Sequence, residues 1–200
     1  LKTKVTRRIA EIPAGDWNKV FPNVLESYDF FKTLDESNLK QFSFYYIMVY
    51  DYATPVGAAP CFIMNYSLDT SIAGPIKRIT SVIKKRMPNI FNLKALICGT
   101  PLGQGRIGMG DHPDYIHVIL RRMEQIAKKN KAAIIAFKDF DKTYDKALDP
   151  LQKKGFSKFT SLPWAELNIN YKNFDEYLKT LSGATWYDLR RKFKKVDNHV

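Results

Sequence analysis

A short run of glycines with two polar side chains is the part of the sequence best suited to hold a ligand. Residues 103–110 read Gly-Gln-Gly-Arg-Ile-Gly-Met-Gly. Glycine lets a backbone turn tightly and bring its N–H groups close to a bound group. A helix is predicted directly after this run, and its first turn offers unpaired N–H donors and the positive end of the helix dipole. The pattern predicts a cradle for a phosphate or pyrophosphate, to which Arg106 could add a charge-assisted contact.

The candidate cradle residues all lie in this loop. The glycines could bind a phosphate through backbone N–H groups, and the two polar residues through their side chains. They are Gly103, Gln104, Gly105, Arg106, Gly108 and Gly110. The run lacks the Gly-Lys-Ser/Thr of a Walker A loop, and the spacing Gly103-x-Gly105-x-x-Gly108 alone is weak evidence for dinucleotide binding. A surface loop that binds nothing is the alternative interpretation.

The elements that must position this loop alternate in type along the chain. An apolar, β-branched strand is expected over 93–102, a helix over 113–129, and a continuously apolar, central strand over 132–137. Residues 42–51 and 56–66 are predicted to form an antiparallel hairpin. Further elements are expected as a strand over 4–12, an apolar turn over 17–21, helices over 24–36, 76–87 and 141–154, two strands or one bent strand over 156–162 and 164–170, and helices from 173 and 185. The helix over 113–129 is expected to bury a stripe made of Ile116, Ile119, Leu120, Met123, Ile126 and Ala127. Gly155 is the expected stop of the helix over 141–154, and Asn173 is the expected cap of the helix that follows it. The order predicts an α/β fold (α+β in its antiparallel part) with a central mixed β-sheet flanked by helices.

The composition is that of a globular protein with a localised basic excess. The chain has 200 residues, 32 Lys+Arg and 20 Asp+Glu, which gives a net charge of +12. All of the excess lies in residues 76–94, 113–131 and 184–200. Such segments could bind an anionic ligand or nucleic acid, although Lys and Arg on solvated helix faces are the simpler explanation. The hydrophobic share of 45% excludes disorder, collagen and coiled coil as the main description.

Other features bear on the location of the protein and on metal binding. No apolar run approaches the roughly 20 residues of a membrane-spanning helix, and the N-terminus has no apolar signal region. Cys61 and Cys98 are interpreted as small buried side chains in a reducing compartment, so a cytoplasmic location is expected. The three histidines do not combine with cysteines or carboxylates at metal-ligand spacing, and no metal is expected.

The order of elements and two motifs resemble the GNAT acyltransferase superfamily. Its loop of pattern Gln/Arg-x-x-Gly-x-Gly/Ala resembles the segment with Gln104, Arg106 and Gly108-Met109-Gly110, although neither polar residue stands three positions before Gly108. The run Lys153-Lys154-Gly155-Phe156 is similar to the family's Lys-x-Gly-Phe. The resemblance implies a GNAT-like fold that binds acetyl-CoA or another acyl-CoA through the glycine loop. The family's frequent tyrosine acid would fall at Leu151, which cannot donate a proton.

A narrower resemblance covers residues 181–195. They look like the Leu-Ser-x-x-x-Arg-x-x-Leu-Arg-Arg-Lys junction of FemAB-like proteins, the peptidoglycan-biosynthesis branch, with Trp186 at the position of the first arginine. This resemblance implies a GNAT-like domain over 1–172 and a helical linker over 173–200. The linker would lead to a second, C-terminal GNAT-like domain absent from this chain. It also implies a role at the bacterial cell envelope.

Acyl transfer to an amine is the function that these observations favour. The donor would be an acyl-CoA or an aminoacyl-tRNA, and the acceptor an amine. Asp139, just after the strand over 132–137, could act as general base, because ligands gather at the carboxyl ends of strands in α/β sheets. The backbone N–H groups at Cys98 and Gly99 are candidate oxyanion donors. The alternatives are a structural role for Asp139 and, for the whole chain, a non-catalytic half that binds RNA, tRNA or an anionic cell-envelope component.

Overall fold

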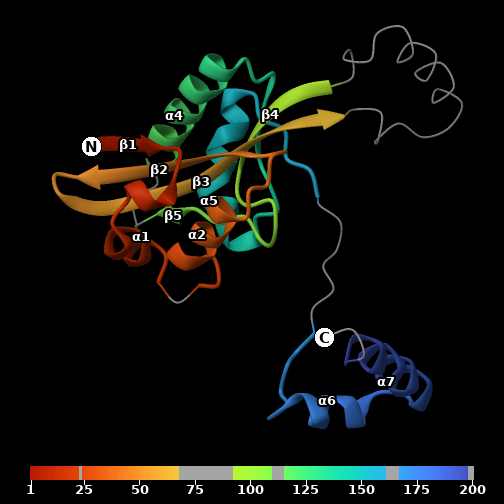
Figure 1. Ribbon diagram of the computed structural model, residues 1–200. Helices are drawn as coiled ribbons and strands as arrows, with labels where there is room; N and C mark the ends of the chain where they lie inside the picture. Colours follow the sequence, from red (N-terminus) through yellow and green to blue (C-terminus); the bar gives the residue numbers. More distant parts are fainter. Residues whose placement is uncertain (23, 68–91, 110–114, 161–166, 198–200) are drawn as a thin grey trace, which may run out of the picture. The chain divides into compact units, whose positions relative to one another are not determined.

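One mixed sheet organises the first 159 residues of the computed structural model (Figure 1). The structure describes all residues except 23, 68–91, 110–114, 161–166 and 198–200. The strand order is β1-β2-β3-β4-β6, and a short β5 also pairs with β3. The bounds are β1 (Lys2–Thr6), β2 (Ser43–Asp51), β3 (Thr54–Ser67), β4 (Asn92–Cys98), β5 (Gly108–Met109) and β6 (Ile134–Phe137). Strands β1 to β4 pair antiparallel, whereas β4 and β6 are parallel, so the predicted mixed sheet is confirmed.

The predicted hairpin is the long antiparallel pair β2–β3. Ile47 lies opposite Ala59, and the register shifts between Val49 and Tyr50 near the turn. Alternate residues of β2 point to opposite faces of the sheet, as the two-residue period of a strand requires. Ile47 and Val49 belong to the core on one face, while Tyr46 and Met48 belong to the core on the other. Helices must therefore cover both faces.

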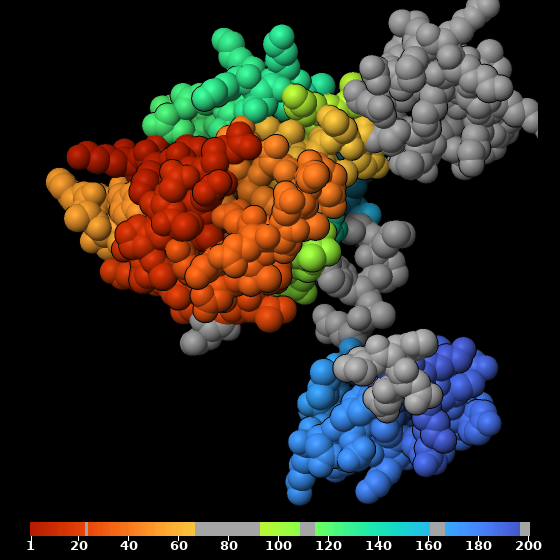
Figure 2. Space-filling model, in the orientation of Figure 1, coloured from red at the N-terminus to blue at the C-terminus, as the bar shows by residue number. Residues whose placement is uncertain are grey.

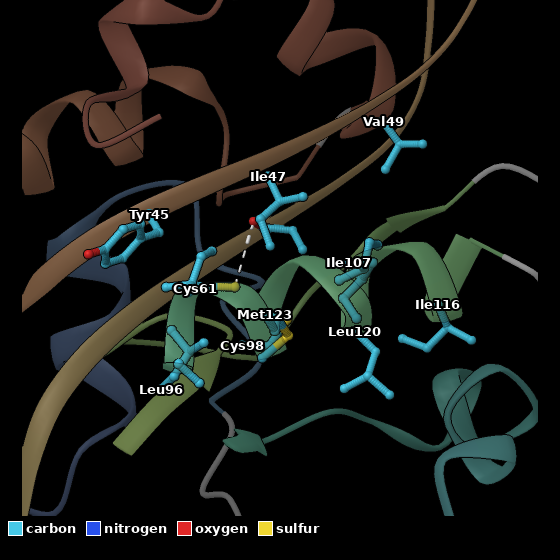
Figure 3. Packing of buried hydrophobic residues seen from close by; sticks show 14 of the residues in the cluster. Tyr45, Ile47, Val49, Cys61, Leu96, Cys98, Ile107, Ile116, Leu120 and Met123 are labelled. Carbon is cyan, nitrogen blue, oxygen red and sulfur yellow. Dashed lines mark hydrogen bonds between the residues drawn. The ribbon is translucent and has the colours of Figure 1, made fainter. Parts of the chain in front are cut away.

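Helix α4 (Tyr115–Asn130) covers one face of the sheet. The predicted stripe is buried against β2, β3 and β4, as Figure 3 shows for Ile116, Leu120 and Met123. The remaining buried members of that stripe are Ile119, Ile126 and Ala127. The sequence predicts this helix well because its apolar residues recur every three or four positions.

Helices α1 (Ala14–Val20) and α2 (Tyr28–Glu36) cover the opposite face through an aromatic cluster. The Trp17 ring meets those of Phe31 and Tyr46 edge-on at centroid distances of 5.2 and 5.7 Å. In the space-filling view, these N-terminal residues, coloured red to orange, make up most of the visible face of this unit (Figure 2).

Two expectations for the N-terminal segment are wrong. The first strand ends at Thr6, and a 3-10 turn η1 (Ile9–Glu11) and helix α1 replace the expected strand end and apolar turn.

The segment after α4 also differs from expectation. Among the described strands, β6 is the last in the sheet order. Its residues are half-buried, whereas the sequence predicted a buried strand at the centre of the sheet. The helix expected over 141–154 is three short pieces, η3 (Lys142–Tyr144), α5 (Asp145–Leu148) and η4 (Asp149–Lys154). They end at Gly155, whose φ of +89° suits glycine, as predicted. Residues 156–160 and 167–170 form no strand, and the helix expected over 76–87 lies outside the described residues.

Residues 160–200 form a second compact unit, and its described residues include two helices. Asn173 caps α6 (Phe174–Thr180) through a 2.9 Å hydrogen bond from the Glu176 N–H, as predicted. Helix α7 (Gly183–Asp197) begins earlier than expected, and Ser182 accepts a hydrogen bond from the Thr185 N–H. The first compact unit ends at Phe159 and the second begins at Thr160. The division into a domain over 1–172 and a linker over 173–200 stays a prediction. Among the described residues, no helix has the length and apolarity needed to cross a membrane.

Candidate functional site

The carboxyl ends of β4 and β6 meet at one edge of the sheet. Cys98 lies opposite Phe137 in the parallel register, and the Lys138 N–H donates to the Cys98 carbonyl at 3.1 Å. The loop after β4 then folds back onto the residues after β6, because the Gly105 N–H donates to the Asp139 carbonyl at 2.9 Å. Cys98, Gly105 and Asp139, which the sequence singled out, therefore lie together at the edge where α/β sheets collect ligands.

Two of the predicted cradle glycines are needed for packing within the protein itself. A Cβ on Gly105 would lie 2.1 Å from the Lys138 carbonyl oxygen. A Cβ on Gly108, which sits in β5, would lie 2.1 Å from Cγ1 of Val20 in α1. Both positions are closed by neighbouring atoms, so the need for glycine there has an explanation that involves no ligand.

The other loop positions are differently placed. Gly103 has a φ of +85° and Gly99 a φ of +125°, which both favour glycine. The Gly99 N–H, a candidate oxyanion donor, already donates to the Pro60 carbonyl at 2.9 Å. Cys98 is fully buried in the sheet core (Figure 3). Gly110 lies outside the described residues.

Arg106 forms an ion pair with a carboxylate that the sequence analysis did not identify. Its Nε lies 2.7 Å from Oε2 of Glu26, in the connection between α1 and α2. The Glu26 side chain is 5% exposed and that of Arg106 is 28% exposed. The Arg106 Nη2 also donates to Gln104 at 3.3 Å. No local motif marks Glu26, because its partner stands eighty residues away in the sequence.

Tyr144, at the end of η3, completes this polar cluster. Its hydroxyl lies close enough to the Arg106 guanidinium and to the backbone of Ile107 for both to influence its ionisation. Burial raises the pKa of the Tyr144 hydroxyl, and the nearby Arg106 charge only partly offsets that effect. The hydroxyl thus stays protonated at neutral pH and can donate a proton. Leu151, the position that family resemblance pointed to, is instead a buried core residue.

Asp139, the candidate base, is the second residue after β6 and follows Lys138. Its backbone has a φ of +57°, and its carboxylate pairs with Nζ of Lys138. The Asp139 side chain is 18% exposed, so it borders the edge of the sheet without being sealed in the core. The carboxyl edge therefore combines carboxylates, a guanidinium and a phenol within a small region.

The cluster from Glu26, Gln104, Arg106 and Tyr144 can contact an anion and supply a proton. A guanidinium carries five N–H donors, and those not used by Glu26, Gln104 and Tyr144 remain on a partly exposed side chain. These residues fit one phosphate contact of a coenzyme, made by the guanidinium of Arg106. The binding role predicted for the glycine backbone stays a prediction. Within the described parts of the chain, no three side chains of His, Cys, Asp or Glu are grouped to hold a metal ion.

Comparison with known proteins finds solved structures with a similar fold, but no family model and no curated sequence that matches this chain. Aminoglycoside antibiotic 6'-N-acetyltransferase AAC(6')-Ig from Acinetobacter haemolyticus is 11% identical, with a TM-score of 0.50 over 85% of this chain and 100% of that one. Aminoglycoside N-acetyltransferase AAC(6')-Iy, solved with CoA, is 9% identical, with a TM-score of 0.50 over 84% of this chain and 94% of that one.

A third similar structure is the tetramutant of the BH1408 protein from Bacillus halodurans. It is 6% identical, with a TM-score of 0.52 over 84% of this chain and 100% of that one. At such identities the likeness concerns the fold. The mixed sheet with helices on both faces is the fold of GNAT acetyltransferases, as the sequence predicted.

Proposed function

We propose that this chain is an N-acyltransferase that moves an acyl group from an acyl-CoA thioester to an amine. The observation that carries the proposal is the polar cluster at the carboxyl edge of β4 and β6, in a fold shared with N-acetyltransferases. Coenzyme A supplies the thioester, which is the activated acyl group. The chain itself must bind an anion, accept a proton from the amine and donate a proton to the departing sulfur.

Three side chains are assigned these tasks. Arg106 contacts a phosphate through the donors that Glu26 leaves unused. Asp139 accepts the proton that the amine loses as its nitrogen bonds to the acyl carbon. Tyr144 donates its proton to the sulfur when the carbon–sulfur bond breaks, which balances the reaction. This assignment replaces Leu151 as the position of the acid, and it does not use the Gly99 N–H, which is hydrogen-bonded to Pro60.

We also propose that the chain belongs to the FemAB-like branch, with α7 leading toward a second domain and a role at the bacterial cell envelope. The pattern over residues 181–195 supports this assignment, and α7 spans most of that pattern. A second candidate function is a non-catalytic binding half. It is favoured by one observation, the neutralisation of Arg106 by a buried carboxylate.

A thiol-release assay distinguishes the two functions. The 200-residue chain is incubated with acetyl-CoA and a panel of primary amines, and free coenzyme thiol is measured with a chromogenic disulfide. An acyltransferase releases thiol only when an amine is present. Tyr144→Phe, which removes one hydroxyl, should lower the rate about tenfold to a thousandfold, within the usual range for a general acid.

The matched control is Tyr52→Phe, since Tyr52 is exposed in the turn between β2 and β3. This variant should keep the full rate. Thiol release that Tyr144→Phe and Tyr52→Phe change equally would contradict the role given to Tyr144. An intact chain that binds acetyl-CoA but releases no thiol with any amine would favour the binding half.

A further inference from the structure

Helix α7 of the second unit carries a basic groove on one side. The groove has a volume of about 420 Å³ and is lined by Tyr187, Arg190, Arg191, Lys194 and Lys195. Four of these five residues are cations, and none is acidic. They stand three, four or one position apart, so they occupy adjoining faces of a single helix. The groove therefore presents four positive charges within about one and a half helical turns, from Arg190 to Lys195.

The charge of this groove is only partly compensated within the unit. Asp188 lies 2.7 Å from Arg191 and 2.7 Å from Lys192, and the hydrogen bonds from these two cations lower the pKa of the Asp188 carboxyl. Among the side chains that the structure describes, none forms an ion pair with Lys194 or Lys195. The groove thus retains charge that an anionic partner could neutralise.

An aromatic ring lines the groove together with the cations. Tyr187 is 71% exposed and stands about one helical turn before Arg190 and Arg191, the first two cations. The apolar side of the helix carries Phe193, whose ring meets that of Phe174 in α6 at 5.7 Å. Contact with α6 therefore involves the apolar side of α7. The groove adjoins that side at Arg190, whose guanidinium lies over the Trp186 ring at 4.9 Å, and its other residues point away from it.

The placement of the basic groove and of the apolar side on α7 indicates which kind of polyanion fits best. A helix that lies on a membrane surface buries its apolar side in lipid and places its aromatic rings there. A surface for single-stranded nucleic acid instead combines cations that follow the phosphates with exposed rings on which bases stack. Residues four apart on a helix are separated by about 6 Å along its axis, so Arg190 and Lys194 can contact different phosphates.

From this arrangement we infer that the α7 groove binds a single-stranded segment of nucleic acid, with cations on its phosphates and Tyr187 stacked on a base. The inference concerns the second unit alone and does not depend on the proposed acyl transfer. It requires that binding respond to both charge and ring, because phosphate contacts alone would bind any polyanion.

Fluorescence anisotropy with the full 200-residue chain tests this inference. The probe is a labelled single-stranded RNA of twelve mixed-sequence nucleotides, with the matching DNA strand as a second probe. Lys194→Gln combined with Lys195→Gln should weaken binding at least fivefold. It should also lower the slope of log affinity against log salt by about 1.4, since each contact contributes about 0.7 for single strands. Tyr187→Ala should weaken binding about fivefold or more, and Tyr187→Phe should restore it.

Controls separate this site from general attraction to a basic protein. Lys172→Gln combined with Lys179→Gln removes the same charge from exposed positions outside the groove, and should leave affinity within about twofold. Inorganic polyphosphate offers charge without bases, so its binding should not respond to Tyr187→Ala. Equal weakening by the two lysine pairs would overturn the inference. So would loss of polyphosphate binding in Tyr187→Ala, or binding to vesicles of anionic lipid without binding to either oligonucleotide.

Discussion

The carboxylate of Glu26 accepts a hydrogen bond from Nε of Arg106 at 2.7 Å, and so joins the connection between α1 and α2 to the loop after β4. The two side chains are unequally buried, because Glu26 is sealed while Arg106 reaches solvent. The pair fixes the orientation of the guanidinium at the carboxyl edge of the sheet. Because the two side chains differ in burial, removing Arg106 and removing Glu26 should lower the free energy of unfolding by different amounts.

Removing Arg106 should destabilise the protein more than removing the charge of Glu26. Arg106→Gln leaves a buried carboxylate without its cation, and we expect a loss of about 2–4 kcal/mol. Glu26→Gln leaves a guanidinium that water can still reach, and we expect about 1 kcal/mol. Urea unfolding of both variants and of the double variant gives the three free energies. Equal losses, or a larger loss for Glu26→Gln, would contradict the unequal burial.

Gly105 should tolerate no side chain, because the space that a Cβ needs is already filled by Lys138 and Phe140. Gly105→Ala should lower the free energy of unfolding by about 1–3 kcal/mol, as overpacking does. Gly15→Ala in α1 is the matched control, since a Cβ there meets nothing within 4 Å and alanine is the better helix former. If both variants are equally stable, the close approach at Gly105 is wrong.

Stability should fall at alkaline pH through Tyr46. Burial raises the pKa of its hydroxyl, and the hydrogen bond that it donates to Asp35 at 2.8 Å adds to this effect. The unfolded tyrosine ionises near 10 and the folded one above it, so stability that is present below pH 10 is lost as the pH rises further. The contribution expected from Tyr46 to this slope is about 1.4 kcal/mol per pH unit.

Thermal unfolding of Tyr46→Phe between pH 8 and 11 measures this linkage, with pH values on either side of the ordinary tyrosine pKa. The variant should be less stable at pH 8, because it lacks the hydrogen bond to Asp35, yet less sensitive to alkali. Tyr52→Phe, at an exposed turn, should keep the wild-type slope. An unchanged slope in Tyr46→Phe would refute the assignment.

Cys61 and Cys98 should react slowly with thiol reagents in the folded protein. They lie opposite each other across β3 and β4, and both are buried free thiols (Figure 3). Burial and the neighbouring Cys61 raise the pKa of the Cys98 thiol, which leaves little reactive thiolate. Labelling should become rapid only in urea, whereas a Tyr52→Cys variant should label one added thiol at once. Rapid native labelling of the wild-type chain would argue against this core.

The sequence predicted those parts of the fold that local patterns determine. The hairpin β2–β3, the buried stripe of α4, the stop at Gly155 and the Asn173 cap all depend on residues close together in the chain. Helix α1 was missed because seven residues give too short a pattern, and its burial depends on Tyr46 from a distant strand.

The site was less accessible to sequence reasoning than the fold. A glycine that cradles a ligand and one that meets a neighbouring carbonyl look identical in sequence, and Gly105 is of the second kind. Glu26 and Tyr144 reach Arg106 only through the tertiary fold, so neither could be identified from spacing. The place of Asp139 at the carboxyl edge could be predicted from the sequence, because residues that directly follow a strand lie at that edge of the sheet.

Calorimetric titration of the 200-residue chain with acetyl-CoA tests the central claim, acyl-CoA binding at the Arg106 edge, most directly. We predict saturable binding of one acetyl-CoA per chain, unchanged in Tyr144→Phe. In Arg106→Lys, which keeps the charge but loses the forked geometry of the guanidinium, we predict weaker binding. Circular dichroism on the same samples confirms that each variant is folded. The account is contradicted if the folded wild-type chain gives no binding heat at millimolar acetyl-CoA, or if Arg106→Lys binds as tightly as wild type.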